Sequence, residues 1–211
     1  IKLDFYFLDY EVMLWSILDD YNSYGLRYKR YINRGTFGLT FFHDRNKSNH
    51  SIYNTIQFIE NQPEPQFPGS NYRIGFDYRY DNIIGLWIEG NTINSSLNDF
   101  NENRLDLITV GFDYTVPVYN GILLLSETMH SSIVSEDINI LNQTSTAFMA
   151  STPIGMFNDL SLICLYDIQS YDSFNLIRWT TTFDLFRISI SYSINPEQIG
   201  NSTQLMFIYN H

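Results

Sequence analysis

The chain has 211 residues, a formal net charge of −11 at pH 7 and one cysteine, Cys164. The acidic balance argues against a nucleic-acid partner, since there is no basic surplus to meet phosphates, and a single cysteine excludes an intrachain disulfide framework and a cysteine-based zinc site. No apolar run reaches the roughly 18 residues that a membrane helix requires, which excludes a helical membrane protein.

Strand patterns begin at Ile1 and dominate the first third of the chain, where helix signals are nearly absent. A short amphipathic helix over residues 11–20 is an alternative to the second strand. The polar run 44–51 predicts a loop, and three prolines within residues 61–71 cannot continue a strand. The strands predicted before residue 61 cover residues 1–8, 10–18, 25–31, 36–43 and 52–60.

Residues 72–91 carry the clearest two-faced pattern. An unbroken period of two predicts one apolar and one polar face, and we expect a hairpin with a three-residue turn, Asp81-Asn82-Ile83. With this turn Tyr80 lies opposite Ile84, and Arg79 opposite Gly85. The apolar row holds Tyr72, Ile74, Phe76, Tyr78 and Tyr80, and the polar row holds Arg73, Gly75, Asp77 and Arg79.

The remaining strands continue the same alternation to the end of the chain. Polar runs predict loops over residues 92–104 and 131–140, and we expect long loops on one side of the sheet and tight turns on the other. This arrangement is typical of a barrel in a membrane with two unlike sides. The further strands predicted cover residues 105–118, 122–130, 142–151, 159–168, 174–183, 186–194 and 203–210.

Matching of the two faces fixes the pairing in two further hairpins. In the late hairpin, a two-residue turn places Phe183 opposite Phe186, Thr182 opposite Arg187, Thr180 opposite Ser189 and Arg178 opposite Ser191. In the middle hairpin, Asp113 lies opposite Glu127, an unfavourable pair of like charges. We expect a neighbouring arginine to offset this pair; a bound metal ion or a substrate cation is the alternative.

The polar rows of these hairpins predict where solutes bind. Mixed, arginine-rich charge suits a water-filled or partly plugged interior, whereas a salt-bridged interior without conduction is the plainer reading. The candidate solute-binding residues are Arg73, Asp77, Arg79, Glu89, Asp113, Glu127, Arg178 and Arg187.

Three segments together resemble bacterial outer-membrane β-barrels of the porin-like kind. They are RIGFDYRYDNIIGLWIEG (73–90), ITVGFDYTVPVYNGILLLSE (108–127) and NDLSLICLYDIQSYDSFNLIRWTTTF (158–183). The resemblance lies in the strand pattern and implies an all-β, antiparallel, up-and-down transmembrane barrel of about 12 to 14 strands. It also implies an outer-membrane location, a lipid bilayer as partner and small solutes or ions as cargo.

We expect a single barrel domain over residues 1–211, with residues missing ahead of Ile1 as an open alternative. Two other functions remain open: a plugged structural barrel that anchors partner subunits in an outer-membrane complex, and a soluble β-sandwich binding module. The histidines show no nucleophile–base arrangement and no ligand spacing, so we expect no catalysis, metal or cofactor. They are His43, His50, His130 and His211.

Overall fold

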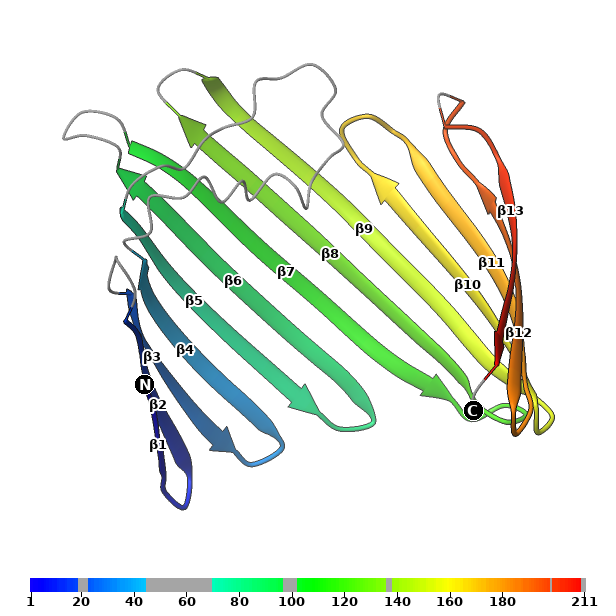
Figure 1. Cartoon of the computed structure of the whole chain (residues 1–211), viewed down its shortest axis with the longest axis horizontal. Helices are drawn as coiled ribbons and strands as arrows, with labels where there is room; N and C mark the ends of the chain where they lie inside the picture. Colours follow the sequence, from blue (N-terminus) through cyan, green and yellow to red (C-terminus); the bar gives the residue numbers. More distant parts are fainter. Residues whose placement is uncertain (19–22, 45–69, 97–101, 136–137, 198, 210–211) are drawn as a thin grey trace. The chain divides into compact units, whose positions relative to one another are not determined.

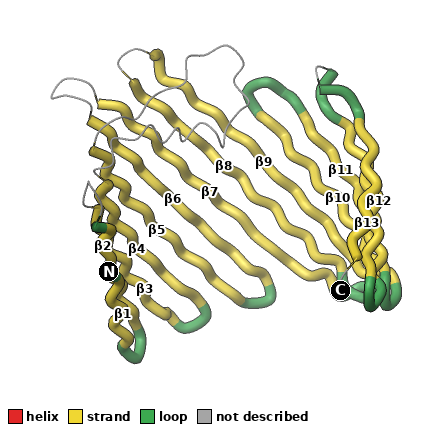
Figure 2. The backbone as a smooth tube through the Cα atoms, in the orientation of Figure 1, coloured by secondary structure: helices red, strands yellow, loops and turns green. Residues whose placement is uncertain are grey.

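The computed structural model describes residues 1–18, 23–44, 70–96, 102–135, 138–197 and 199–209. These residues form thirteen antiparallel strands in one sheet, ordered from β1 to β13 as in the sequence (Figure 1), and no helix (Figure 2). The strands are β1 (Lys2–Tyr6), β2 (Tyr10–Ile17), β3 (Ser23–Ile32), β4 (Gly35–Asp44), β5 (Ser70–Asp81), β6 (Ile84–Ser96), β7 (Glu102–Val116), β8 (Ile122–Ser135), β9 (Ile138–Ile154), β10 (Asn158–Asp167), β11 (Ser173–Thr182), β12 (Phe186–Ile194) and β13 (Ser202–Tyr209).

The all-β, up-and-down architecture is therefore confirmed, and each strand pairs with its sequence neighbours. The alternative helix over residues 11–20 was wrong where it is described, because β2 occupies residues 10–17. The strand predicted over residues 52–60 lies outside the described residues. No helix in the described part of the chain is long and apolar enough to cross a membrane.

Two of the predicted loops are shorter than expected. The polar run 92–104 contains the end of β6 and the start of β7, and the run 131–140 contains the end of β8 and the start of β9. Backbone hydrogen bonds of a ladder do not depend on side-chain polarity, so polar residues extend these strands beyond their apolar rows. Only residues 136–137 separate β8 from β9, so the expected alternation of long and short connections fails there.

The register predicted for the late hairpin is confirmed. Arg178 pairs with Ser191, Thr180 with Ser189, and Thr182 with Arg187 across β11 and β12. The turn is closed by the backbone N–H of Phe183, which donates to the carbonyl oxygen of Phe186 at 2.8 Å. The alternation of apolar and polar residues was enough to predict this register, because a shift by one residue would have moved every apolar side chain to the other face.

The residues cluster into two compact units. Unit 1 contains Ile1–Tyr80, Ile88–Ile108 and Ser131–Asn142, and unit 2 contains Asp81–Trp87, Thr109–His130 and Gln143–His211. The polar face of unit 1 is the side that carries Arg27, Arg73 and Asp77. The polar face of unit 2 carries Arg178 and Ser189 on its late strands and Trp87 and Glu127 on its early ones. The apolar face is the opposite side in each unit.

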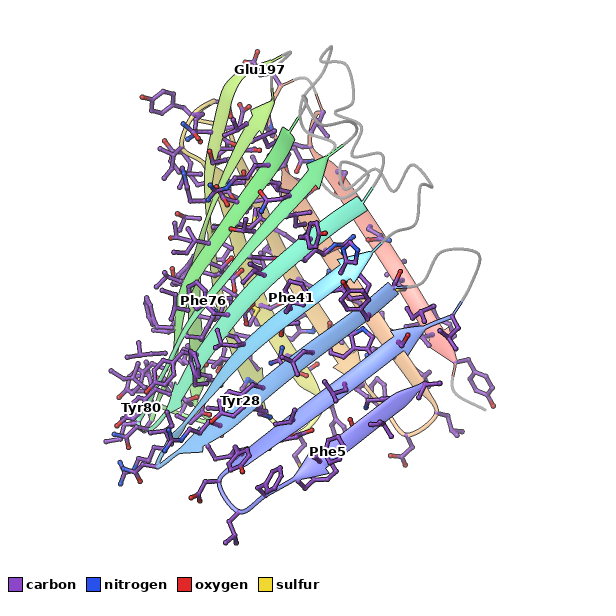
Figure 3. All side chains as sticks on the ribbon, turned by 90° about the vertical axis from the view of Figure 1, so that its left-hand side faces the viewer. Phe5, Tyr28, Phe41, Phe76, Tyr80 and Glu197 are labelled. Atoms are coloured by element: carbon purple, nitrogen blue, oxygen red, sulfur yellow. The ribbon has the colours of Figure 1, made fainter. Side chains whose placement is uncertain are left out.

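The apolar face is the exposed one. In unit 1 a lateral row of directly opposite residues runs Phe5, Val12, Tyr28, Leu39, Phe76 from β1 to β5; Phe5, Tyr28 and Phe76 are labelled in Figure 3. Phe5 is 46% exposed and Leu39 45%. In unit 2 the isoleucines and serines of β12 alternate, and Ile190 is 51% exposed whereas Ser189 is 5% exposed. Soluble domains bury the opposite set of residues.

The buried apolar residues in the described part of the chain form one small cluster in unit 1. Ile93 on β6, Leu105 on β7 and Ile133 on β8 are buried, and Leu107 packs against them. Soluble domains commonly bury a larger contiguous core than this cluster.

Candidate functional site

The polar face of unit 1 holds an ion pair that spans three strands. Arg27 on β3 donates from Nη2 to Asp77 Oδ1 on β5 at 2.7 Å and from Nη1 to Thr40 Oγ1 on β4 at 2.9 Å. Gly38 lies directly opposite Asp77 on β4, and a Cβ added there would lie 2.5 Å from Asp77 Oδ1. The glycine therefore lets the carboxylate lie over β4 and meet Arg27.

A second row on the same face combines aromatic rings with Arg73. Trp15, Gly25, Phe42 and Arg73 lie directly opposite one another on β2 to β5. A Cβ at Gly25 would overlap the Trp15 ring, so Trp15 covers β3 and stacks on Phe42 at 6.1 Å between ring centroids. The Arg73 Cζ atom lies 5.6 Å from the centroid of the Phe42 ring.

Unit 2 repeats the use of a glycine beneath a neighbouring side chain. Trp87 on β6 lies over Gly111 on β7, where a Cβ would overlap the indole. Its Nε1 donates to Glu127 Oε2 on β8 at 3.2 Å. Asp113 lies over Gly85 in the same way, with Oδ1 2.7 Å from the position of a Cβ. Glu127 therefore has the Trp87 indole as a partner, and the offset of Asp113 and Glu127 by a neighbouring arginine stays a prediction.

The structure places the other predicted residues on strands without joining them into one cluster. Arg178 and Arg187 are exposed on β11 and β12, beside hydroxyl groups rather than carboxylates. Arg79 on β5 lies opposite Thr36, and Glu89 on β6 is exposed. Unit 1 thus contains Arg73, Asp77, Arg79 and Glu89, and unit 2 contains Asp113, Glu127, Arg178 and Arg187.

Among the described residues no group of three or more His, Cys, Asp and Glu could hold a metal ion. His43 is 1% exposed on the apolar face, stacked on Tyr72 at 4.3 Å and tilted against Tyr24 at 4.9 Å. His130 Nδ1 shares a hydrogen bond of 2.8 Å with Thr144 Oγ1. Gln169 Nε2 also donates to Thr144 Oγ1 at 3.3 Å, but no third group among the described residues orients His130 as a base for this hydroxyl.

Sequence reasoning missed four members of the site: Arg27, Trp15, Phe42 and Trp87. The alternation of apolar and polar residues along each strand places Arg27, Trp15 and Phe42 on the polar face. Which residues lie beside them on adjacent strands depends on strand order and register. The signal that could have found them is the glycine on the polar side of each adjacent strand, since a glycine leaves room for a bulky side chain from the next strand.

Comparison with known proteins found no matching family model, no matching curated protein and no matching solved structure.

Proposed function

We propose that the sheet forms the wall of a porin-like outer-membrane β-barrel, whose polar face lines an interior that small solutes or ions pass or bind. The observation that carries the proposal is the inverted exposure along β12, where Ile190 and Ile194 are 51% exposed while Ser189 and Ser191 are 5% and 8% exposed. An exposed apolar face of this extent is unfavourable in water. In a barrel the same face meets lipid.

Aromatic rings at strand ends also support a membrane location. In unit 2, Phe157, Phe183, Phe186 and Phe207 make successive ring contacts beside the start of β10, the end of β11, the start of β12 and the end of β13. In unit 1, Tyr24 and Tyr72 flank His43 where β3 and β5 begin and β4 ends. Aromatic rings at strand ends suit the boundary between the hydrocarbon core and the lipid headgroups, where membrane barrels carry aromatic girdles.

Several strands have the length that suits a bilayer crossing. A tilted strand needs about 9–11 residues to cross the hydrocarbon core. The strands β3, β4, β10 and β11 each have 10 residues, and β5 has 12. The proposal further requires the sheet to close, because an edge left open in hydrocarbon exposes unpaired backbone groups.

A plugged or narrow barrel that anchors partner subunits is the second candidate. Bulky rings on the polar faces favour it: Trp15 and Phe42 in unit 1 and Trp87 in unit 2 occupy space that a wide channel would leave to water. A soluble β-sandwich receives less support, since its apolar rows would be the buried ones.

The first experiment tests the membrane claim. We expect the protein to require detergent for solubility and to migrate differently on a gel with and without heating, as closed barrels do. A detergent-free, monodisperse protein whose migration does not depend on heating would refute the barrel in both its open and its plugged form.

The second experiment separates the open from the plugged form. Discrete conductance steps in planar bilayers are expected of an open pore, and a membrane-inserted protein without them would be plugged. For an open pore, Arg73→Glu combined with Arg79→Glu shifts selectivity toward cations, because the interior loses two positive charges and gains two negative ones. An unchanged reversal potential under a salt gradient would contradict the assignment of these residues to the interior.

A further inference from the structure

We propose that Arg73, Phe42 and Trp15 form a binding site for a small organic anion with a planar apolar group, such as an aromatic carboxylate. The inference rests on the proposed function, since it takes the polar face of unit 1 to be open to solutes. It goes beyond that function by naming the chemical class that this face selects.

Arg73 differs in its charge environment from Arg27 and Arg104, two other arginines of unit 1. Arg27 is paired with Asp77 at 2.7 Å, and Arg104 with Asp106 at 2.8 Å. Among the described residues no carboxylate pairs with Arg73. Its Nε atom is also buried without a hydrogen-bond partner. A buried donor in this state is uncommon and calls for an acceptor, which a bound anion would supply.

The aromatic rings beside Arg73 specify the second half of the ligand. Phe42 lies beneath the guanidinium, and Trp15 extends the ring surface toward β2. The planes of the two rings are 19° apart, so each ring presents a nearly parallel apolar surface. A planar ligand group can stack on such a surface, while a carboxylate receives paired N–H donors from an arginine fork.

The row that holds these residues contains no acid to repel an anion. Lys2 on β1 lies directly opposite Trp15 at its far end, and the positions between Lys2 and Arg73 are Trp15, Gly25 and Phe42. Of the acids near this row in register, Asp4 is engaged by Lys2 and Asp77 by Arg27, while Asp44 lies two residues beyond Phe42 on β4. The row is therefore a locally cationic and aromatic strip in a chain of net charge −11.

The test uses benzoate, acetate and benzyl alcohol as probes, with binding to the detergent-solubilised full chain followed by ligand-observed saturation-transfer NMR. We expect benzoate to bind at least tenfold more tightly than acetate or benzyl alcohol, because only benzoate offers both a carboxylate and a ring. Arg73→Gln lowers the affinity for benzoate at least tenfold. Arg73→Lys lowers it less, since the positive charge remains while the paired N–H donors of the guanidinium are lost. Phe42→Leu lowers the affinity for benzoate to that for acetate and leaves the affinity for acetate unchanged.

The matched control is Arg104→Gln, which removes an exposed arginine of unit 1 that is already paired with Asp106 at 2.8 Å and leaves benzoate binding unchanged. Heat-dependent gel migration verifies that each variant is folded. Equal benzoate affinity in wild type and folded Arg73→Gln overturns the site, as does a loss of affinity in Arg104→Gln equal to that in Arg73→Gln. Conductance steps without benzoate binding would overturn the benzoate site but support the open pore. Benzoate binding without conductance steps would support the site and refute the open pore.

Discussion

Asp77 on β5 reaches Arg27 on β3 by lying over Gly38 on the strand between them, and the two side chains meet at 2.7 Å. Trp87 reaches Glu127 across Gly111 in the same manner, from β6 to β8. Polar-face glycines thus allow side chains two strands apart to contact each other. Ordinary cross-strand pairs join only adjacent strands, so these contacts connect the sheet over a greater width.

Gly38→Ala tests this role of glycine. The new Cβ would lie 2.5 Å from Asp77 Oδ1, so the carboxylate must move away and the ion pair with Arg27 is lost. We expect the free energy of unfolding to fall by about 1–3 kcal/mol, as for overpacking elsewhere, measured by urea unfolding from lipid vesicles. Gly75→Ala is the control, since its Cβ would meet no atom closer than 3.5 Å. Equal effects of the two substitutions would contradict the assigned role.

The Arg27–Asp77 interaction is measurable as a coupling energy. In a double-mutant cycle with Arg27→Gln and Asp77→Asn we expect a coupling of about 1 kcal/mol, because both side chains are about one-third exposed and water screens the pair. The Lys2–Asp4 pair has side chains 57% and 25% exposed, and the same cycle there gives a coupling near zero. Additive single substitutions at Arg27 and Asp77 would mean that the pair contributes nothing to stability.

Trp87→Phe keeps a ring over Gly111 and removes the hydrogen bond to Glu127. The half-buried carboxylate then lacks this donor, and we expect a loss of about 1 kcal/mol in unfolding free energy. Glu127→Gln retains an acceptor for the indole and is expected to have a smaller effect. Trp179→Phe is the matched control, because the bond that it removes, to Thr181, joins two neutral groups, and such a bond contributes less than one to a carboxylate. A loss in Trp179→Phe equal to that in Trp87→Phe would exclude the Glu127 bond as the cause.

The assignment of the apolar face to lipid predicts that a charged side chain costs more stability on one face of β12 than on the other. Ile190→Lys introduces a charge on the apolar face and is expected to destabilise the vesicle-inserted protein by about 2–4 kcal/mol if it lies near the bilayer midplane. Ser193→Lys introduces the same side chain on the half-buried polar face and is expected to cost much less. Urea unfolding from vesicles measures both, and the reverse order would place the polar face against lipid.

The sequence predicted the strands where apolar and polar residues alternate, and the pairing where a short turn left one register, as in β11 and β12. It failed at the ends of β6 to β9, since polar residues there form ladder hydrogen bonds without an apolar row to mark them. Alternation also assigned each side chain to a face. It could not find Arg27 as the partner of Asp77, because the two are 50 residues apart and meet only through the order and register of β3, β4 and β5.

The glycines beneath Asp77 and Trp87 also constrain how this sequence can diverge. A side chain at position 38 fits only if position 77 becomes small, and the same holds for positions 111 and 87. Substitutions within each pair are therefore expected to occur together among descendants of this chain. Each pair keeps one small and one bulky residue, and either position can hold the small one. Covariation between positions on adjacent strands would then record the register of the sheet.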